Sequence, residues 1–270
     1  MDTSQIQLLL PQVIEAVERA GILLAQECVR PGGRRGCGDK AEIDVEIEVL
    51  LRAELLSLLD CDWWGEETGH ILTGYPFCWV VDPNDGTSDF LRGLKGSAIS
   101  VGLLHDGNPV LGVVHAPITP SGIPDCIAWA KGMGYLLRNG HRVVVDLSDQ
   151  KLSNTSTVMV SAAAVSKPEL NKELCEPAEF FAMPSIAYRL ARVAAGDGIC
   201  GISLYPVSAH DVVAGHALLL GSGGTLVGEL GDPIKYVTEG SMLRVSERCF
   251  GGATDACLEL TKRDWNKVFE

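Results

Sequence analysis

The segment WVVDPNDGTSDF at 79–90 constrains this chain most, because an apolar run ends abruptly in two aspartates, Asp82 and Asp85. Such a run indicates a strand buried on both faces, whose carboxyl end points in one fixed direction. Pro83 restricts the backbone there, and Gly86 lets the chain approach a ligand closely. We therefore expect the two carboxylates to converge, with a hard cation such as magnesium, manganese or calcium between them.

The same residues could also form only a tight turn, because Asp, Pro, Asn and Gly are the commonest turn residues. Other acidic residues support the metal interpretation. Glu66 and Glu67 lie in a loop before the strand, and Asp211 stands in the first turn of an apolar helix. For Asp211 alone, helix capping is the simpler explanation. Asp44 could be a solvated helix residue, one turn from Glu48 on a shared face.

Composition narrows the class of protein. The chain has 270 residues, 46% of them hydrophobic and 21% charged, which is typical of a folded cytoplasmic protein with a substantial core. Its first residues show neither a signal peptide nor a membrane span. The net charge of −13 argues against a nucleic-acid polymer or a membrane surface as the main partner. The nine cysteines form no metal-binding or redox spacing and are interpreted as reduced, mostly buried thiols.

Hydrophobic spacing predicts how the chain is organised. Two helices are expected at about 5–29 and 43–59, joined by a glycine- and arginine-rich loop at 31–40 that is a candidate mobile segment. An antiparallel meander should follow, with strands at 77–81, 98–104, 110–116, 127–130, 134–140 and 142–145. The second half predicts strands at 157–161 and 199–204 and helices at about 185–195, 211–220 and 254–268. Such alternation favours a layered α/β structure.

These motifs together resemble the inositol monophosphatase superfamily, the lithium-sensitive, magnesium-dependent phosphatases, over nearly the whole chain. The family's strand followed by Asp-Pro-x-Asp-Gly-Thr is present as Val80 to Thr87, with Phe90 after it. Gly65-Glu66-Glu67-Thr68 looks like its Gly-Glu-Glu-Ser/Thr element. His210 to Gly215, followed by Gly223-Gly224, is similar to its carboxyl-terminal Trp-Asp-x-Ala-x-Gly signature.

The resemblance implies roles for particular residues. Metal ligands would be the side chains of Glu66, Asp82, Asp85 and Asp211, with the backbone carbonyl of Asn84, and they would hold two or three Mg²⁺ ions, with Mn²⁺ as a substitute. Asp44 and Thr87 would orient or deprotonate the attacking water, and Glu66 would also serve catalysis. Phosphate and substrate contacts would come from Gly86, Thr87, Ser185 and His210.

The resemblance also implies a fold and partners. It predicts an α/β fold, a five-layer α-β-α-β-α sandwich, as a single domain over 1–270, with an α+β region of about 1–147 and an α/β region of about 148–270. A homodimer is the family's usual state. The substrate would be a small phosphorylated metabolite of the inositol monophosphate or 3′-phosphoadenosine 5′-phosphate type.

Some positions depart from the family pattern. Asn84 stands where an aliphatic residue is usual, and His210 stands where tryptophan is usual, so His210 either contacts substrate or replaces the packing of that ring. Leu204 occupies the position of the glutamate that grips inositol hydroxyls, and Asp89 favours the nucleotide branch. Sugar bisphosphates remain a third substrate class. A pseudophosphatase with a regulatory or binding role is the main alternative, and a structural calcium-binding protein is the weakest.

Overall fold

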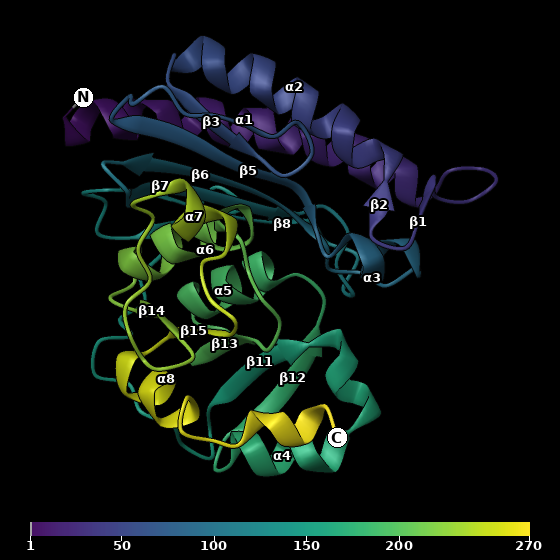
Figure 1. The fold of residues 1–270 in the computed structure, drawn as a ribbon, viewed down its shortest axis with the longest axis vertical. Helices are drawn as coiled ribbons and strands as arrows, with labels where there is room; N and C mark the ends of the chain where they lie inside the picture. The colour runs from purple at the N-terminus through teal and green to yellow at the C-terminus, as the bar shows by residue number, and fades with distance from the viewer. Residues whose placement is uncertain (1) are drawn as a thin grey trace.

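The computed structural model describes residues 2–270, and Figure 1 shows them as alternating layers of helices and sheets. Helices α1 (Thr3–Cys28) and α2 (Glu42–Leu58) cover one face of the first sheet. Helices α5 (Ile186–Ala194) and α6 (Ala209–Gly221) lie between the two sheets. Helices α4 (Pro168–Cys175) and α8 (Thr254–Leu260) lie beyond the second. The expected α-β-α-β-α sandwich is therefore confirmed.

The first sheet has eight strands in the order β10-β9-β8-β7-β6-β5-β3-β4. Neighbours from β5 to β10 pair antiparallel, so the predicted meander is confirmed, and Asp106-Gly107 and Asn139-Gly140 make the predicted hairpin turns. Strand β3 pairs parallel with β5. The strands are β3 Asp62–Gly65, β4 His70–Ile71, β5 Phe77–Asp85, β6 Ala98–His105, β7 Asn108–Ala116, β8 Asp125–Ala130, β9 Leu136–Arg138 and β10 His141–Val143.

The second sheet has five strands in the order β12-β11-β13-β15-β14. Its first three strands pair parallel, and β15 pairs antiparallel with both β13 and β14. The predicted strands at 157–161 and 199–204 appear as β11 and β13. The strands are β11 Thr157–Ser161, β12 Glu179–Met183, β13 Cys200–Ser203, β14 Thr225–Gly228 and β15 Cys249–Gly252.

The last helix is shorter than the spacing predicted. Helix α8 ends at Leu260, and a separate 3₁₀ turn covers Trp265–Val268. Asp264 caps this turn by accepting a hydrogen bond from the Asn266 N–H group. The Trp265 indole N–H donates to the Leu260 carbonyl, so the chain bends back and buries its tryptophan. The apolar spacing across 254–268 thus reflects two elements that cover the same core.

Short elements were not predicted. The 31–40 segment contains a small hairpin of β1 (Gly36–Cys37) and β2 (Lys40–Ala41), and Arg35 holds it to the buried carboxylate of Glu27. Pro11 lies inside α1, which begins at Thr3. Two further helices of five residues each are α3 (Thr87–Leu91) and α7 (Glu239–Leu243).

Among the described residues, every helix is too short or too polar to cross a bilayer.

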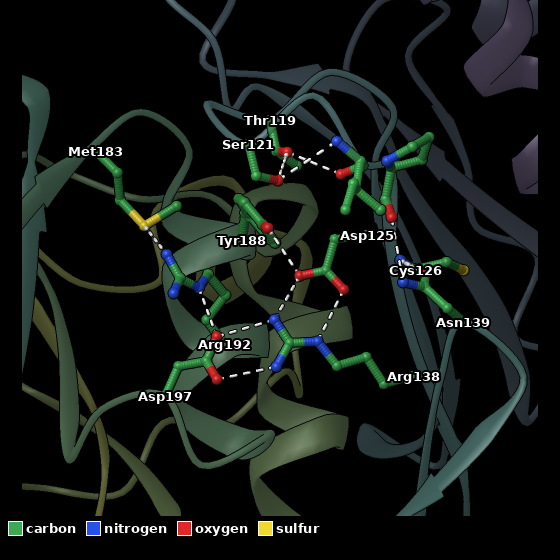
Figure 2. A network of polar contacts seen from close by, with 12 residues as sticks. Thr119, Ser121, Asp125, Cys126, Arg138, Asn139, Met183, Tyr188, Arg192 and Asp197 are labelled. Atoms are coloured by element: carbon green, nitrogen blue, oxygen red, sulfur yellow. Dashed lines mark hydrogen bonds and ion pairs between the residues drawn. The ribbon is translucent and has the colours of Figure 1, made fainter.

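A polar network joins the first sheet to helix α5 (Figure 2). The Arg138 guanidinium donates to Asp125 at 2.9 and 2.7 Å and to Asp197 at 2.9 Å. Arg192 donates to the same Asp197 carboxylate at 2.7 Å, and the Tyr188 hydroxyl donates to Asp125 at 2.8 Å. Two guanidinium groups therefore alternate with two carboxylates, which fixes α5 against β8 and β9.

Candidate metal centre

The two aspartates of the DPND segment end strand β5, as predicted. The β5–β6 register is irregular between Asp82 and Asp85, where the strand carries Pro83. Both side chains are buried, and the Asn84 N–H donates to an Asp82 oxygen at 2.8 Å. One oxygen from each of Asp82, Asp85 and Asp211 lies within 4.8 Å of the others. The predicted convergence of Asp82 and Asp85 is confirmed, and the structure adds Asp211 to them; the metal-binding roles of all three stay predictions.

Asp211 serves as a helix cap and also belongs to the cluster. It lies in the first turn of α6, where the Ser208 N–H donates to its Oδ2 at 2.5 Å in a capping box. Its carboxylate is at the same time within 4.8 Å of Asp82 and Asp85. Capping and a place in the cluster are compatible, because a carboxylate has two oxygens and can face two directions. Its role as a metal ligand stays a prediction.

Glu66 reaches the cluster from the end of β3. The parallel pairing of β3 with β5 brings Gly65 opposite Val81, and the Glu66 N–H donates to the Val81 carbonyl at 3.2 Å. Glu66 itself lies at the exposed rim, but its carboxyl group comes within 4.8 Å of ligand atoms on Asp82 and His210. The parallel pair thus places Glu66 beside Asp82, although they are far apart in the sequence.

Crowding makes the cluster electrostatically costly without a cation. Burial, followed by repulsion from the neighbouring carboxylates, raises the pKa of Asp82 well above its ordinary value. Burial also raises the pKa of Asp85 and of Asp211 to about 6, and that of Glu66 to about 8. Carboxyl groups this close cannot all ionise cheaply on their own. A bound divalent cation would reverse these shifts.

Asp44 lies beside Thr87 and Asn84. Its carboxylate is fully buried and accepts from the Thr87 hydroxyl and from the Asn84 side-chain amide, each at 2.9 Å. The Thr87 hydroxyl also lies 2.9 Å from the Asn84 carbonyl, which is an alternative acceptor for its single proton. Burial raises the pKa of Asp44 to about 6. The interpretation of Asp44 as a solvated helix residue is therefore wrong.

Gly86 and Ser185 lie close together beside Asp85. Gly86 has φ of 95°, and an added Cβ would lie 3.2 Å from the Ser185 backbone nitrogen, so this position requires glycine. The Ser185 hydroxyl donates to Asp85 at 2.6 Å, as does the Ala187 N–H. Ser185 has φ of 58° and caps α5 by accepting from Tyr188 N–H. Its hydroxyl group thus holds a cluster carboxylate, and its substrate contact stays a prediction.

Glu48 supports the site, although its place in the sequence did not predict this role. This fully buried carboxylate accepts from the Glu67 N–H at 2.8 Å, the Thr68 N–H at 2.7 Å and the Thr68 hydroxyl at 2.5 Å. It therefore holds the loop directly after Glu66. Its position one turn after Asp44 was the available signal, since both residues lie on the helix face that meets the site.

His210 points toward Glu66 and Asp82, one residue before Asp211. Its side chain is 17% exposed, and its Nδ1 atom is buried without a hydrogen-bond partner. Burial lowers the pKa of its imidazole to about 4. Two positions noted for their bearing on the substrate class lie outside the cluster. Leu204 packs against the core around the second sheet, and Asp89 pairs with Arg92.

The donor set fits a divalent cation. Four carboxylates meet here from three elements: Glu66 follows β3, Asp82 and Asp85 lie near the end of β5, and Asp211 lies in the first turn of α6. The described residues place no lysine or arginine in an ion pair with them. Buried carboxylates without a cationic partner are uncommon unless they bind a metal. Oxygen donors of this kind suit Mg²⁺ and Mn²⁺.

A family profile described as the inositol monophosphatase family matches residues 11–248. The chain belongs to the inositol monophosphatase family. It is 30% identical over 240 residues to a 3′(2′),5′-bisphosphate nucleotidase from Aggregatibacter actinomycetemcomitans, covering 84% of this chain and 87% of that protein. It is 29% identical over 216 residues to a probable inositol 1-monophosphatase from Mycobacterium tuberculosis, covering 74% and 75% of the two chains.

Solved structures agree with this fold. An inositol monophosphatase structure from Thermotoga maritima has a TM-score of 0.74 at 22% identity and covers 95% of this chain and 96% of its own. One from Anabaena has a TM-score of 0.72 at 22% identity, with coverage of 95% and 94%. Family membership makes this protein a phosphoric monoester hydrolase that acts on a small phosphorylated molecule.

Proposed function

We propose that this protein is a magnesium-dependent phosphatase whose metal ligands are Glu66, Asp82, Asp85, Asp211 and the backbone carbonyl of Asn84. The observation that carries the proposal is the convergence of the buried Asp82 and Asp85 carboxylates with the half-buried Asp211 carboxylate within 4.8 Å. Glu66 reaches Asp82 within the same limit, and among residues 2–270 no lysine or arginine is paired to these groups. When bound, divalent cations lower the pKa of a coordinated water and neutralise charge on phosphate oxygens. Mn²⁺ should substitute for Mg²⁺.

The chain's own residues would orient the nucleophile. The Thr87 hydroxyl can pass its proton to the Asp44 carboxylate at 2.9 Å, which leaves the Thr87 oxygen free to accept a proton from the attacking water. Burial raises the pKa of Asp44 to about 6, which makes this carboxylate a stronger base than an exposed aspartate. The backbone N–H groups of Gly86 and Thr87 would receive the phosphate.

The proposed substrate is a small phosphomonoester of the 3′-phosphoadenosine 5′-phosphate or inositol monophosphate type. Relatives named for each activity support this range. The substitution of leucine at position 204 for the glutamate that the family uses to grip inositol hydroxyl groups favours the nucleotide over inositol phosphate, because that acceptor is lost. We also expect a homodimer that is inhibited by lithium, which sedimentation and a lithium titration would test.

The test is phosphate release from 3′-phosphoadenosine 5′-phosphate, inositol 1-phosphate and fructose 1,6-bisphosphate, with and without Mg²⁺. Asp85→Asn is the diagnostic variant, and Asp106→Asn in an exposed hairpin turn is its matched control. Metal-assisted charge stabilisation amounts to several kcal/mol, so Asp85→Asn should lower kcat/KM at least about 100-fold while the control stays near wild type. Metal binding without release from any substrate would favour the pseudophosphatase alternative.

A further inference from the structure

His210 stands at the metal cluster but has no explained role in it. One of its ring nitrogens lies within 4.8 Å of carboxylate oxygens on both Glu66 and Asp82, and these two oxygens lie within 4.8 Å of each other. The three residues come from the end of β3, the end of β5 and the first turn of α6. This arrangement is compact enough for three atoms to share one ion.

The imidazole lacks a hydrogen-bond partner among residues 2–270. Its Nδ1 is buried without a partner, and its Nε2 lies 3.9 Å from Asp211 Oδ2, beyond hydrogen-bond distance. The backbone of His210 is held in place, since its carbonyl accepts from the Ser100 hydroxyl at 3.2 Å. Buried polar atoms in folded proteins are nearly always paired, so an unpaired ring beside two carboxylates points to a missing ligand.

The chemistry of imidazole decides which ion suits this position. A site with only carboxylate, carbonyl and water oxygens suits Mg²⁺, which seldom accepts nitrogen. Replacing one oxygen by an imidazole nitrogen favours transition metals, because their affinity for nitrogen donors is higher. A ring that only packed against substrate would not need to be within reach of two metal-binding carboxylates.

We propose that His210 is a nitrogen ligand of the ion held by Glu66 and Asp82, and that it shifts the preference of this position from Mg²⁺ toward transition-metal ions such as Mn²⁺. The inference rests on the proposed metal site. Asp82, Asp85 and Asp211 then form a second, all-oxygen position that keeps its preference for Mg²⁺.

Binding measurements and spectroscopy test this inference without reference to activity. Mn²⁺ and Mg²⁺ affinities would be measured by calorimetry on wild type, His210→Phe and His210→Gln, and the Mn²⁺-loaded proteins would be examined by electron spin-echo modulation for ¹⁴N coupling. His210→Gln keeps a polar side chain in case the phenylalanine variant fails to fold. The control is His216→Gln, which removes another buried imidazole from the same helix, where it contacts Tyr236 rather than the cluster.

We expect ¹⁴N coupling in wild type and in the His216 control, and its loss in both His210 variants. The Mn²⁺ affinity of the Glu66 position should fall at least about tenfold in the His210 variants, with Mg²⁺ affinity changing less than about threefold. Coupling that is absent from wild type, or equal losses for both ions, overturns the role of His210 and leaves the proposed phosphatase intact. A wild type that binds neither ion overturns both.

Discussion

Replacing Glu48 by glutamine should weaken the metal site although Glu48 touches no proposed ligand side chain. The Glu48 carboxylate accepts three hydrogen bonds from Glu67 and Thr68, at 2.5 to 2.8 Å, in a fully buried position. A glutamine side chain offers one acceptor oxygen, and its NH₂ group would face a backbone N–H that also donates. At least one buried N–H group then loses its acceptor.

The magnitude follows from these contacts. A buried donor left without an acceptor costs about 1–3 kcal/mol, and hydrogen bonds to a charged acceptor contribute about 1.5–3 kcal/mol each. We therefore expect Glu48→Gln to lose about 2–4 kcal/mol of unfolding free energy. If 1.4 kcal/mol of this free energy is lost from the interactions that hold Glu66 in its metal-binding position, metal affinity drops about tenfold.

The assay combines urea unfolding in EDTA with calorimetric titration of Mn²⁺. Glu46→Gln is the matched control, because Glu46 lies exposed on the same helix and pairs only with Arg35. Its surface ion pair should contribute below about 1 kcal/mol, without an effect on metal affinity. If Glu48→Gln matched this control in both measurements, the idea that Glu48 holds the Glu66 loop would be wrong.

Three further predictions concern other parts of the molecule. Asp82→Asn should raise or preserve the melting temperature in EDTA, because it removes buried repulsion, and should abolish the stabilisation by added Mg²⁺ that we expect in wild type. Gly86→Ala should lower both stability, by about 1–3 kcal/mol, and kcat, since φ is 95° and Ser185 leaves little room. Burial lowers the pKa of His216 from 6.5 to about 4. The stabilisation that the neutral imidazole gives the folded state is therefore present above pH 6.5 and is lost as pH falls toward 4. Urea unfolding should show about 2 kcal/mol less loss between pH 7 and pH 5 in His216→Gln than in wild type, and equal losses would contradict this shift.

Local patterns account for what the sequence could predict. Asp82 and Asp85 share one strand end, and Asp211 opens a helix with its own start signal, so spacing alone placed each of them on the correct element. The long helices and the meander were predicted because their apolar periods extend over many residues. The hairpin turns carry glycine after a residue with positive φ.

Long-range pairings account for what the sequence could not predict. The hydrogen bond from Ser185 to Asp85 joins residues 100 positions apart, and Glu48 meets Thr68 across 20 positions. Nothing near these residues in the sequence indicates their partners. The break between α8 and the final 3₁₀ turn was missed for a related reason, because one apolar spacing fits either a continuous helix or two shorter elements on the same core.

The network around Arg138 has a consequence for the proposed metal site. Glu66, Asp82 and Asp85 lie at the first sheet, whereas Ser185, which steadies Asp85, begins the helix that Arg138, Asp197 and Arg192 tie to that sheet. Without a cation the carboxylates repel one another. The ion pairs among Arg138, Asp197 and Arg192 lie away from the carboxylates and oppose this repulsion by keeping α5 against the first sheet. If the proposed cations bind, we therefore expect them to exchange without refolding of the site, because the ionic network holds α5 and the first sheet together without them.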